Sequence, residues 1–283
     1  MADELGDRMK EIEGMESDRR FLRQLPICAR LDGKCFSSFT RNMRKPYDER
    51  FSKCMAWTTE FLVQETNARI GYTQSDEISL VFYEPDFKSQ IFFDGRIQKM
   101  VSVLASMATL KFYKNLDVNL SGWANEFPVF DCRVWQVPNK EEACNVLLFR
   151  EIDATKNSIA GVAQMHYSHK ELFGKGQADQ HEMLHAKGVN WATDFPVFFK
   201  RGVYFQRRKI TRAFTPEELV NLPEKHEARK NPEMLVERHE VRQIDMPPFS
   251  KIINKADVVF EGALPEIYTA DGKLTQDISE WTK

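Results

Sequence analysis

Two stretches decide the fold of this 283-residue chain: PICARLDG at residues 26–33 and GYTQSDEISLVF at residues 71–82. The first is an apolar run that closes on the turn-forming pair Asp32-Gly33. The second belongs to two strand-like runs, 68–74 and 78–83, which Ser75-Asp76-Glu77 separates at hairpin spacing. These stretches predict three neighbouring strands.

Two helical patterns and a fourth strand complete the plan. Asp48 is placed to cap a helix, after which Phe51, Cys54 and Met55 begin an apolar repeat of three and four residues. Residues 95–114 repeat the pattern, and residues 128–137 form a strand-like run. The order β-α-β-β-α-β over residues 26–137 predicts an α+β, ferredoxin-like antiparallel sheet with helices on one face.

Composition bounds the class of protein. Hydrophobic residues make up 42%, and 40 Lys and Arg face 42 Asp and Glu, for a net charge of -2. These values exclude a largely disordered chain and a general attraction to polyanions. Five scattered cysteines predict reduced thiols. Because no apolar run approaches 20 residues and the first residues are charged, we expect no membrane span and a cytosolic protein.

The pattern divides the chain into four parts. We expect an exposed helical segment over residues 1–25, a core domain over 26–140, a mostly helical region over 141–220, and a C-terminal extension over 221–283. The whole chain beyond residue 140 is predicted to be mostly helical.

The predicted topology brings acidic residues together. The first and third strands of such a sheet are antiparallel neighbours, so the end of one meets the start of the other. Asp32 would then lie beside Asp76 and Glu77, and a divalent cation would relieve their repulsion. Gly33 would let its carbonyl reach a metal and let phosphate approach the following amides. The alternative is that both segments are ordinary turns.

Four motifs resemble those of the tRNA(His) guanylyltransferase family and its bacterial and archaeal "like" proteins. They are ARLDGKCFSSFTR (29–41), RKPYDER (44–50), GYTQSDEISLVF (71–82) and FPVFDCRVWQVP (127–138). The resemblance implies a polymerase-like palm that adds nucleotides in the 3′ to 5′ direction to the 5′ end of a tRNA. It also implies a homo-oligomer, a tetramer in this family, with ATP and GTP as substrates.

The resemblance also implies roles for individual residues. Asp32, Asp76 and the Gly33 carbonyl would bind two Mg²⁺ ions, with Glu77 supporting the site. Nucleotide-binding positions would be Asp32, Gly33, Lys34, Cys35, Phe36, Ser37, Lys45, Asp48, Ser75, Asp76, Arg96 and Lys99. The eukaryotic enzymes carry His-Ile-Asn-Asn where this chain has Thr155-Lys156-Asn157-Ser158, which favours the "like" branch and repair of 5′-truncated tRNAs.

Two other enzyme classes are alternatives. HEMLH at residues 181–185 has the HExxH spacing of a zinc metalloprotease, but Gly188 would end the helix early and no obvious third ligand follows. A nucleotide cyclase would use the same acidic pair on its own triphosphate.

A basic segment favours a polynucleotide substrate over the cyclase. Residues 199–215 carry six Lys and Arg, no acid, and interleaved aromatic residues. The RNA-binding residues predicted from it are Lys200, Arg201, Arg207, Arg208 and Lys209, with a solvated charged strand as the alternative.

Overall fold

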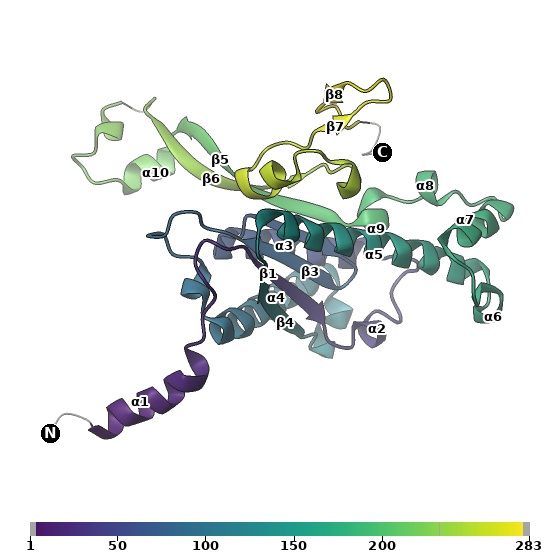
Figure 1. Cartoon of the computed structure of the whole chain (residues 1–283), viewed down its shortest axis with the longest axis horizontal. Coiled ribbons are helices and arrows are strands. Elements are labelled where there is room, and N and C mark those ends of the chain that lie inside the picture. The colour runs from purple at the N-terminus through teal and green to yellow at the C-terminus, as the bar shows by residue number, and fades with distance from the viewer. Residues whose placement is uncertain (1–3, 232, 280–283) are drawn as a thin grey trace.

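The predicted sheet is part of a larger one. A computed structural model describes residues 4–231 and 233–279. In it, six antiparallel strands lie in the order β4-β1-β3-β2-β5-β6 (Figure 1). Their bounds are β1 Ile27–Gly33, β2 Ile70–Gln74, β3 Glu77–Phe82, β4 Phe130–Gln136, β5 Val203–Ala213 and β6 Leu235–Ile244. The first four strands confirm the β-α-β-β-α-β order.

The two predicted helices cover one face of the sheet. They are α3 (Glu49–Thr66) and α4 (Ile97–Asn119). Asp48 caps α3 as predicted, because its side chain accepts a hydrogen bond from the Arg50 N–H. The core between helices and sheet is rich in aromatic rings, and Phe36, Phe51, Phe112 and Phe130 contact one another within it. We call this the first face.

The expectation that helices lie on one face alone is wrong. The 27-residue helix α5 (Lys140–His166) packs across the second face, where Leu147 and Cys144 join a cluster with Cys28 and Val81 of the sheet. The C-terminal tail continues this cover: Gln206 donates hydrogen bonds to the carbonyls of Val258 and Ala263. Both faces are therefore buried, so β1 and β3 are apolar on either side.

The chain after residue 140 is less helical than predicted. It contains α6 His169–Leu172, α7 Gln177–Ala186, α8 Trp191–Asp194, α9 Val197–Arg201, α10 Pro216–Asn221 and the pair β7 Ile267–Tyr268 and β8 Leu274–Thr275. It also supplies β5 and β6, which pair along ten residues. The expected division at residue 220 falls between these two strands, so it separates parts of one sheet.

Two segments project from the body of the molecule. The predicted N-terminal helix is α1 (Glu4–Ser17), which has no buried residue. Beyond Gln206, β5 and β6 leave the other strands and form a two-stranded ribbon that α10 flanks (Figure 1). No helix in the described ranges has the length and apolarity needed to cross a membrane.

Candidate active site

The ends of β1 and β3 meet, as the topology argument expects. Asp32 is the register partner of Glu77, and the Gly33 N–H donates to the Asp76 carbonyl over 3.1 Å. Burial, and then the negative charge of Asp32, raise the pKa of the Asp76 carboxyl. The structure therefore brings Asp32, Gly33, Asp76 and Glu77 together. We call this part of the sheet the acidic end.

The segment after β1 turns back tightly over the core. Gly33 has no room for a side chain, because a Cβ there would lie 2.4 Å from the Phe36 ring. Cys35 takes a left-handed conformation (φ 58°) and precedes the short helix α2 (Phe36–Phe39). The Phe36 side chain is buried in the core. Residues 32–37 can therefore meet a ligand through their backbone, whereas the Phe36 ring cannot.

A hollow beside the acidic end gathers three of the predicted nucleotide-binding residues. It has a volume of about 150 Å³ and is lined by residues 40, 43–48, 51–52, 74–75 and 198–199. Lys45, Asp48 and Ser75 thus face one space. The Lys45 ammonium donates to the Thr40 carbonyl over 3.3 Å.

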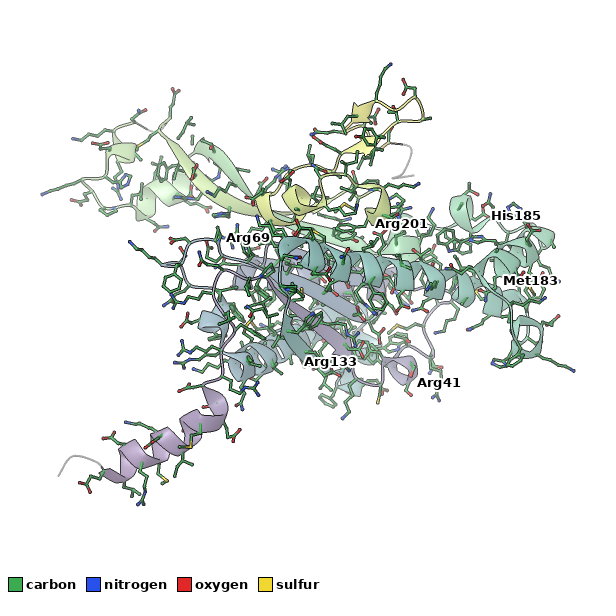
Figure 2. All side chains as sticks on the ribbon, viewed as in Figure 1. Arg41, Arg69, Arg133, Met183, His185 and Arg201 are labelled. Atoms are coloured by element: carbon green, nitrogen blue, oxygen red, sulfur yellow. The ribbon has the colours of Figure 1, made fainter. Side chains whose placement is uncertain are left out.

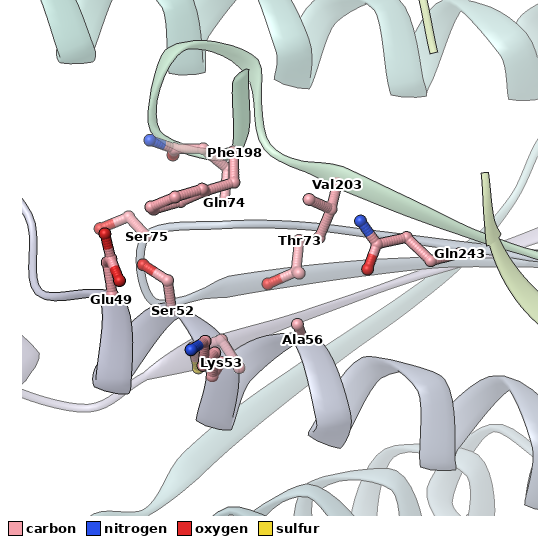
Figure 3. A pocket seen from close by; sticks show the side chains of 11 residues that line it. Glu49, Ser52, Lys53, Ala56, Thr73, Gln74, Ser75, Phe198, Val203 and Gln243 are labelled. Atoms are coloured by element: carbon pink, nitrogen blue, oxygen red, sulfur yellow. The ribbon is translucent and has the colours of Figure 1, made fainter. Parts of the chain in front are cut away.

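A second cavity, of about 160 Å³, adjoins this hollow. Figure 3 shows Phe198 over the cavity, with Glu49, Ser52 and Lys53 of α3 on one side and Thr73 of β2 on another. Ser52, Gln74, Ser75 and Phe198 line both spaces. The turn that carries Asp76 is therefore bordered by two connected cavities.

Asp48 contributes to this wall structurally. Its carboxylate accepts hydrogen bonds from the Arg50 guanidinium over 2.7 and 3.0 Å and from two backbone N–H groups. The bond from Arg50 contributes most to lowering the pKa of Asp48 to about 2. Since its oxygens are occupied and it is 4% exposed, its side chain holds the loop in place.

Glu77 has a partner that the sequence did not reveal. Arg150 of α5 binds both carboxylate oxygens, over 2.6 and 2.7 Å, and Arg30 lies 3.7 Å away. Burial raises the pKa of Glu77 and the bonds from Arg150 oppose that shift. Glu77 is thus held by an arginine, whereas the described residues offer no ion pair to Asp32 or Asp76. Because Glu77 and Arg150 are 73 positions apart, no local signal in the sequence marks this pairing.

A further acid lies beside Asp32 on the neighbouring strand. Asp131 of β4 is the register partner of Asp32 on the side away from Glu77. It is more exposed and lies 3.8 Å from Arg133. The sequence singled out neither residue, because their strand lies about a hundred positions from Asp32.

Arg96 and Lys99 do not join this site within one chain, which corrects the prediction. They lie at the start of α4, after the other end of β3, where Phe92 stacks on Phe82. Six residues of strand put that end about 17 Å from the acidic end. Arg96 approaches Asp18 there, at 3.9 Å.

The prediction that the basic segment, residues 199–215, binds RNA also needs correction. Lys200 is 4% exposed and donates to the Ala192 carbonyl, and Arg201 is half-buried. Arg207 donates to Asn67, and Arg208 forms an ion pair with Glu240 at 3.0 Å. Lys209 is exposed. The segment is therefore not the solvated charged strand of the alternative either, because its cations are largely buried or paired.

HEMLH lies on α7, but its first histidine has another neighbour. The His181 ring packs against Trp191, 5.5 Å between ring centres. In the ranges 4–231 and 233–279, no group of three His, Cys, Asp or Glu side chains is arranged to hold a metal ion. HEMLH therefore forms no zinc site here.

Comparison with known proteins identifies the family. Residues 6–138 match the tRNA(His) guanylyltransferase (Thg1) family model. A bacterial Thg1-like protein solved with ATP is 33% identical, with a TM-score of 0.66 over 72% of this chain and 87% of that one. A bacterial Thg1-like protein solved with GTP is 29% identical, with the same TM-score over 88% and 95%.

A curated relative is also similar to most of this chain. An uncharacterized protein of Acanthamoeba polyphaga mimivirus is 31% identical over 229 residues, which cover 73% of this chain and 78% of the relative. The chain therefore belongs to the tRNA(His) guanylyltransferase family. It is a nucleotidyltransferase, as the motifs predicted.

Proposed function

We propose that the protein extends the 5′ end of a tRNA in the 3′ to 5′ direction, using the strand of the acceptor stem opposite that end as template. The observation that carries this proposal is the meeting of the β1 and β3 ends, where Asp32 pairs with Glu77 and the Gly33 N–H donates to the Asp76 carbonyl, beside a hollow that Lys45 and Ser75 line. The sheet would serve as the palm of a polymerase, with its acids at one end. The relatives solved with ATP and GTP support nucleoside triphosphates as substrates.

The donor set at the acidic end suits magnesium. Asp32 and Asp76 offer hard oxygen ligands with no cation paired to them in the described ranges, and the Gly33 carbonyl lies in the same turn. Two bound Mg²⁺ ions would lower the pKa of an attacking hydroxyl and offset charge on the transferred phosphate. The charge of Glu77 is balanced by Arg150, so Asp32 and Asp76 would supply the negative charge of the site.

The chain's own groups would position the triphosphate. Backbone N–H groups in residues 35–37 follow the acidic strand end, because those of Gly33 and Lys34 already donate to the Asp76 and Val129 carbonyls. Gly33 keeps that turn clear of a β-carbon. Lys45 and Ser75 both line the hollow. No side chain is required as a covalent nucleophile, because the hydroxyl of the incoming nucleotide attacks the activated 5′ end.

Residues 155–158 favour the Thg1-like branch of the family. They read TKNS where the eukaryotic enzymes carry HINN, and the solved bacterial neighbours are Thg1-like proteins. We therefore propose repair of 5′-truncated tRNAs by a cytosolic homotetramer.

An extension assay tests the function. The protein is incubated with Mg²⁺, labelled ATP or GTP, and a tRNA that is intact or lacks its first 5′ nucleotide. We expect products longer at the 5′ end, with the truncated tRNA preferred. A cyclic nucleotide as the product, with no change in the RNA, would instead identify a cyclase and contradict the proposal.

A further inference from the structure

A cavity on the outer side of α5 is not part of the site described above. It has a volume of about 510 Å³, within the range of pockets that enclose small ligands. Its walls come from α5, α7, α8, α9 and the C-terminal tail, and the α5 residues among them lie around the middle of that helix. Figure 1 shows the tail and α9 along α5, with α7 and α8 toward the C-terminal end of that helix. The residues used below are Thr155, Trp191, Lys200, Arg201 and Glu151, all of which line it.

One wall of the cavity carries a buried lysine whose hydrogen-bond donors are not all used. Lys200 is 4% exposed, and its ammonium donates to the Ala192 carbonyl and lies 5.8 Å from the Trp191 ring centre. No carboxylate in the described ranges forms an ion pair with it, although an ammonium has three donors. Burial, and then the charge of Arg201, lower the pKa of Lys200. A ligand with a negative charge would offset the buried charge of Lys200 and accept its unused hydrogen bonds.

The remaining acid of the cavity is already bonded. Glu151 accepts hydrogen bonds from the Tyr204 hydroxyl over 2.9 Å and from the Phe249 N–H over 2.7 Å. Burial raises its pKa, against those bonds and the charge of Arg201. The charges that face the cavity are thus two cations and one carboxylate that is fixed by other groups.

An aromatic wall accompanies these cations. Trp191 is partly exposed, and its indole N–H donates to the Ser158 hydroxyl over 3.2 Å, which fixes the ring plane. A fixed aromatic ring beside cationic groups is how proteins hold unpaired nucleotides, because every base can stack and every phosphate is negative. Thr155 and Ser158 belong to the TKNS stretch that departs from the eukaryotic motif.

One short helix joins this cavity to the nucleotide site. Phe198 and Phe199 of α9 line the hollow at Ser75, and the next two residues, Lys200 and Arg201, line this cavity. Figure 2 marks Arg201 where α9 meets the C-terminal tail. A nucleic acid strand that passes the acidic end could therefore reach the cavity without crossing the molecule.

We propose that this cavity binds an unpaired nucleotide from the 3′ strand of the RNA substrate, with its base on Trp191 and its phosphate near Lys200 and Arg201. This inference rests on the proposed function, because it names the part of the same substrate that enters the cavity. A base-paired nucleotide cannot enter a pocket, whereas the 3′ end of a tRNA is unpaired directly beside the 5′ end that is extended.

A binding experiment without catalysis tests the proposal. Two stem-loop RNAs with the same acceptor stem, one blunt and one with a short single-stranded 3′ tail, are titrated by fluorescence anisotropy in the absence of nucleoside triphosphates. We expect the tail to tighten binding to the wild type about tenfold, as one stacked base does. Trp191→Ala should lose this gain and keep its affinity for the blunt stem.

Matched variants separate stacking from general damage. Trp191→Phe should retain most of the gain, and Trp57→Ala, on the exposed side of α3, should retain all of it. In addition, 2-aminopurine placed in the tail should lose fluorescence on binding to the wild type. This readout decides the question even if Trp191→Ala does not fold.

The outcomes also separate the two proposals. Equal affinity for both RNAs, with no change in 2-aminopurine fluorescence, would overturn the cavity assignment and leave the polymerase function standing. Failure to bind either RNA would overturn both.

Discussion

The acidic end of the sheet and the β5–β6 ribbon are both rich in charged residues. They differ in whether those charges have partners of opposite sign. Asp32 and Asp76 lie side by side with no cation paired to them in the described ranges. On the ribbon, Arg208 meets Glu240 at 3.0 Å and Arg212 meets Glu218 at 2.7 Å. A charge near charges of its own sign needs a ligand, whereas a matched charge does not.

The difference has a structural cause. Antiparallel register places Asp32 beside Glu77 and Asp131, so β1, β3 and β4 all contribute acids to one row. In the ribbon, register instead places Arg208 opposite Glu240, and Glu218 of the flanking helix α10 pairs with Arg212. Sequence composition cannot distinguish these cases, because both depend on which strands become neighbours.

The largest effect is expected from the acids themselves. Asp32→Asn and Asp76→Asn keep the size of each side chain and remove the charge that would hold the metals. We expect each to lower the extension rate by at least about 10³-fold and to leave the melting temperature unchanged or higher, because a repulsion is relieved. The control is Asp86→Asn, in the loop beyond the far end of β3. Unchanged extension rates would contradict the assignment.

The next largest effect, on stability, is expected at Glu77, the acid that is paired with an arginine. Arg150→Ala leaves the half-buried Glu77 without its bidentate donor, which should lower the free energy of unfolding by about 3 kcal/mol. Urea denaturation measures this. The double variant Glu77→Gln with Arg150→Met should recover most of the loss, because no unpaired charge is left. A single variant as stable as the wild type would show that the pair contributes little.

A smaller effect is expected at the cap of α3. Asp48→Ala removes the cap and should cost about 1–2 kcal/mol, whereas Asp48→Asn keeps a capping side chain and should cost less. Arg50 lowers the pKa of Asp48 to about 2. Its ionised form therefore stabilises the fold above the unfolded value near 3.9, and this stabilisation is lost as the pH falls. The stability difference between wild type and Asp48→Asn should shrink below about pH 4 in thermal melts.

The smallest effects should fall on the ribbon. Arg208→Ala removes a base already matched by Glu240, so the salt dependence of tRNA binding should not change. Lys209→Ala removes an exposed charge, and if RNA reaches the ribbon the slope of log affinity against log salt should fall by about one. Equal slopes for both variants and the wild type would place the RNA elsewhere on the molecule.

The sequence predicted those features that local patterns encode. Apolar repeats located α3 and α4, Asp48 marked the start of α3, and turn residues located the β2–β3 hairpin. The meeting of Asp32 and Asp76 followed from topology alone. These inferences needed no contact beyond the β-α-β-β-α-β unit.

The features it missed depend on distant segments. The cover of the second face by α5, and with it the Arg150–Glu77 pair, requires knowing where residues 140–166 pack. The placement of Arg96 at the far end of β3 requires the length of the strand, and the burial of Lys200 requires α8 and α9. A basic residue has the same signature in sequence whether it is solvated, paired or buried.

One measurement tests the central claim most directly: a crystal structure of the protein with Mn²⁺ and a non-hydrolysable ATP analogue, with the metal located by anomalous scattering. We predict two peaks at the acidic end, with carboxylate oxygens of both Asp32 and Asp76 at about 2.0–2.2 Å, the distance typical of such hard cations. Metal bound to the triphosphate elsewhere, with neither aspartate as a ligand, would contradict the account.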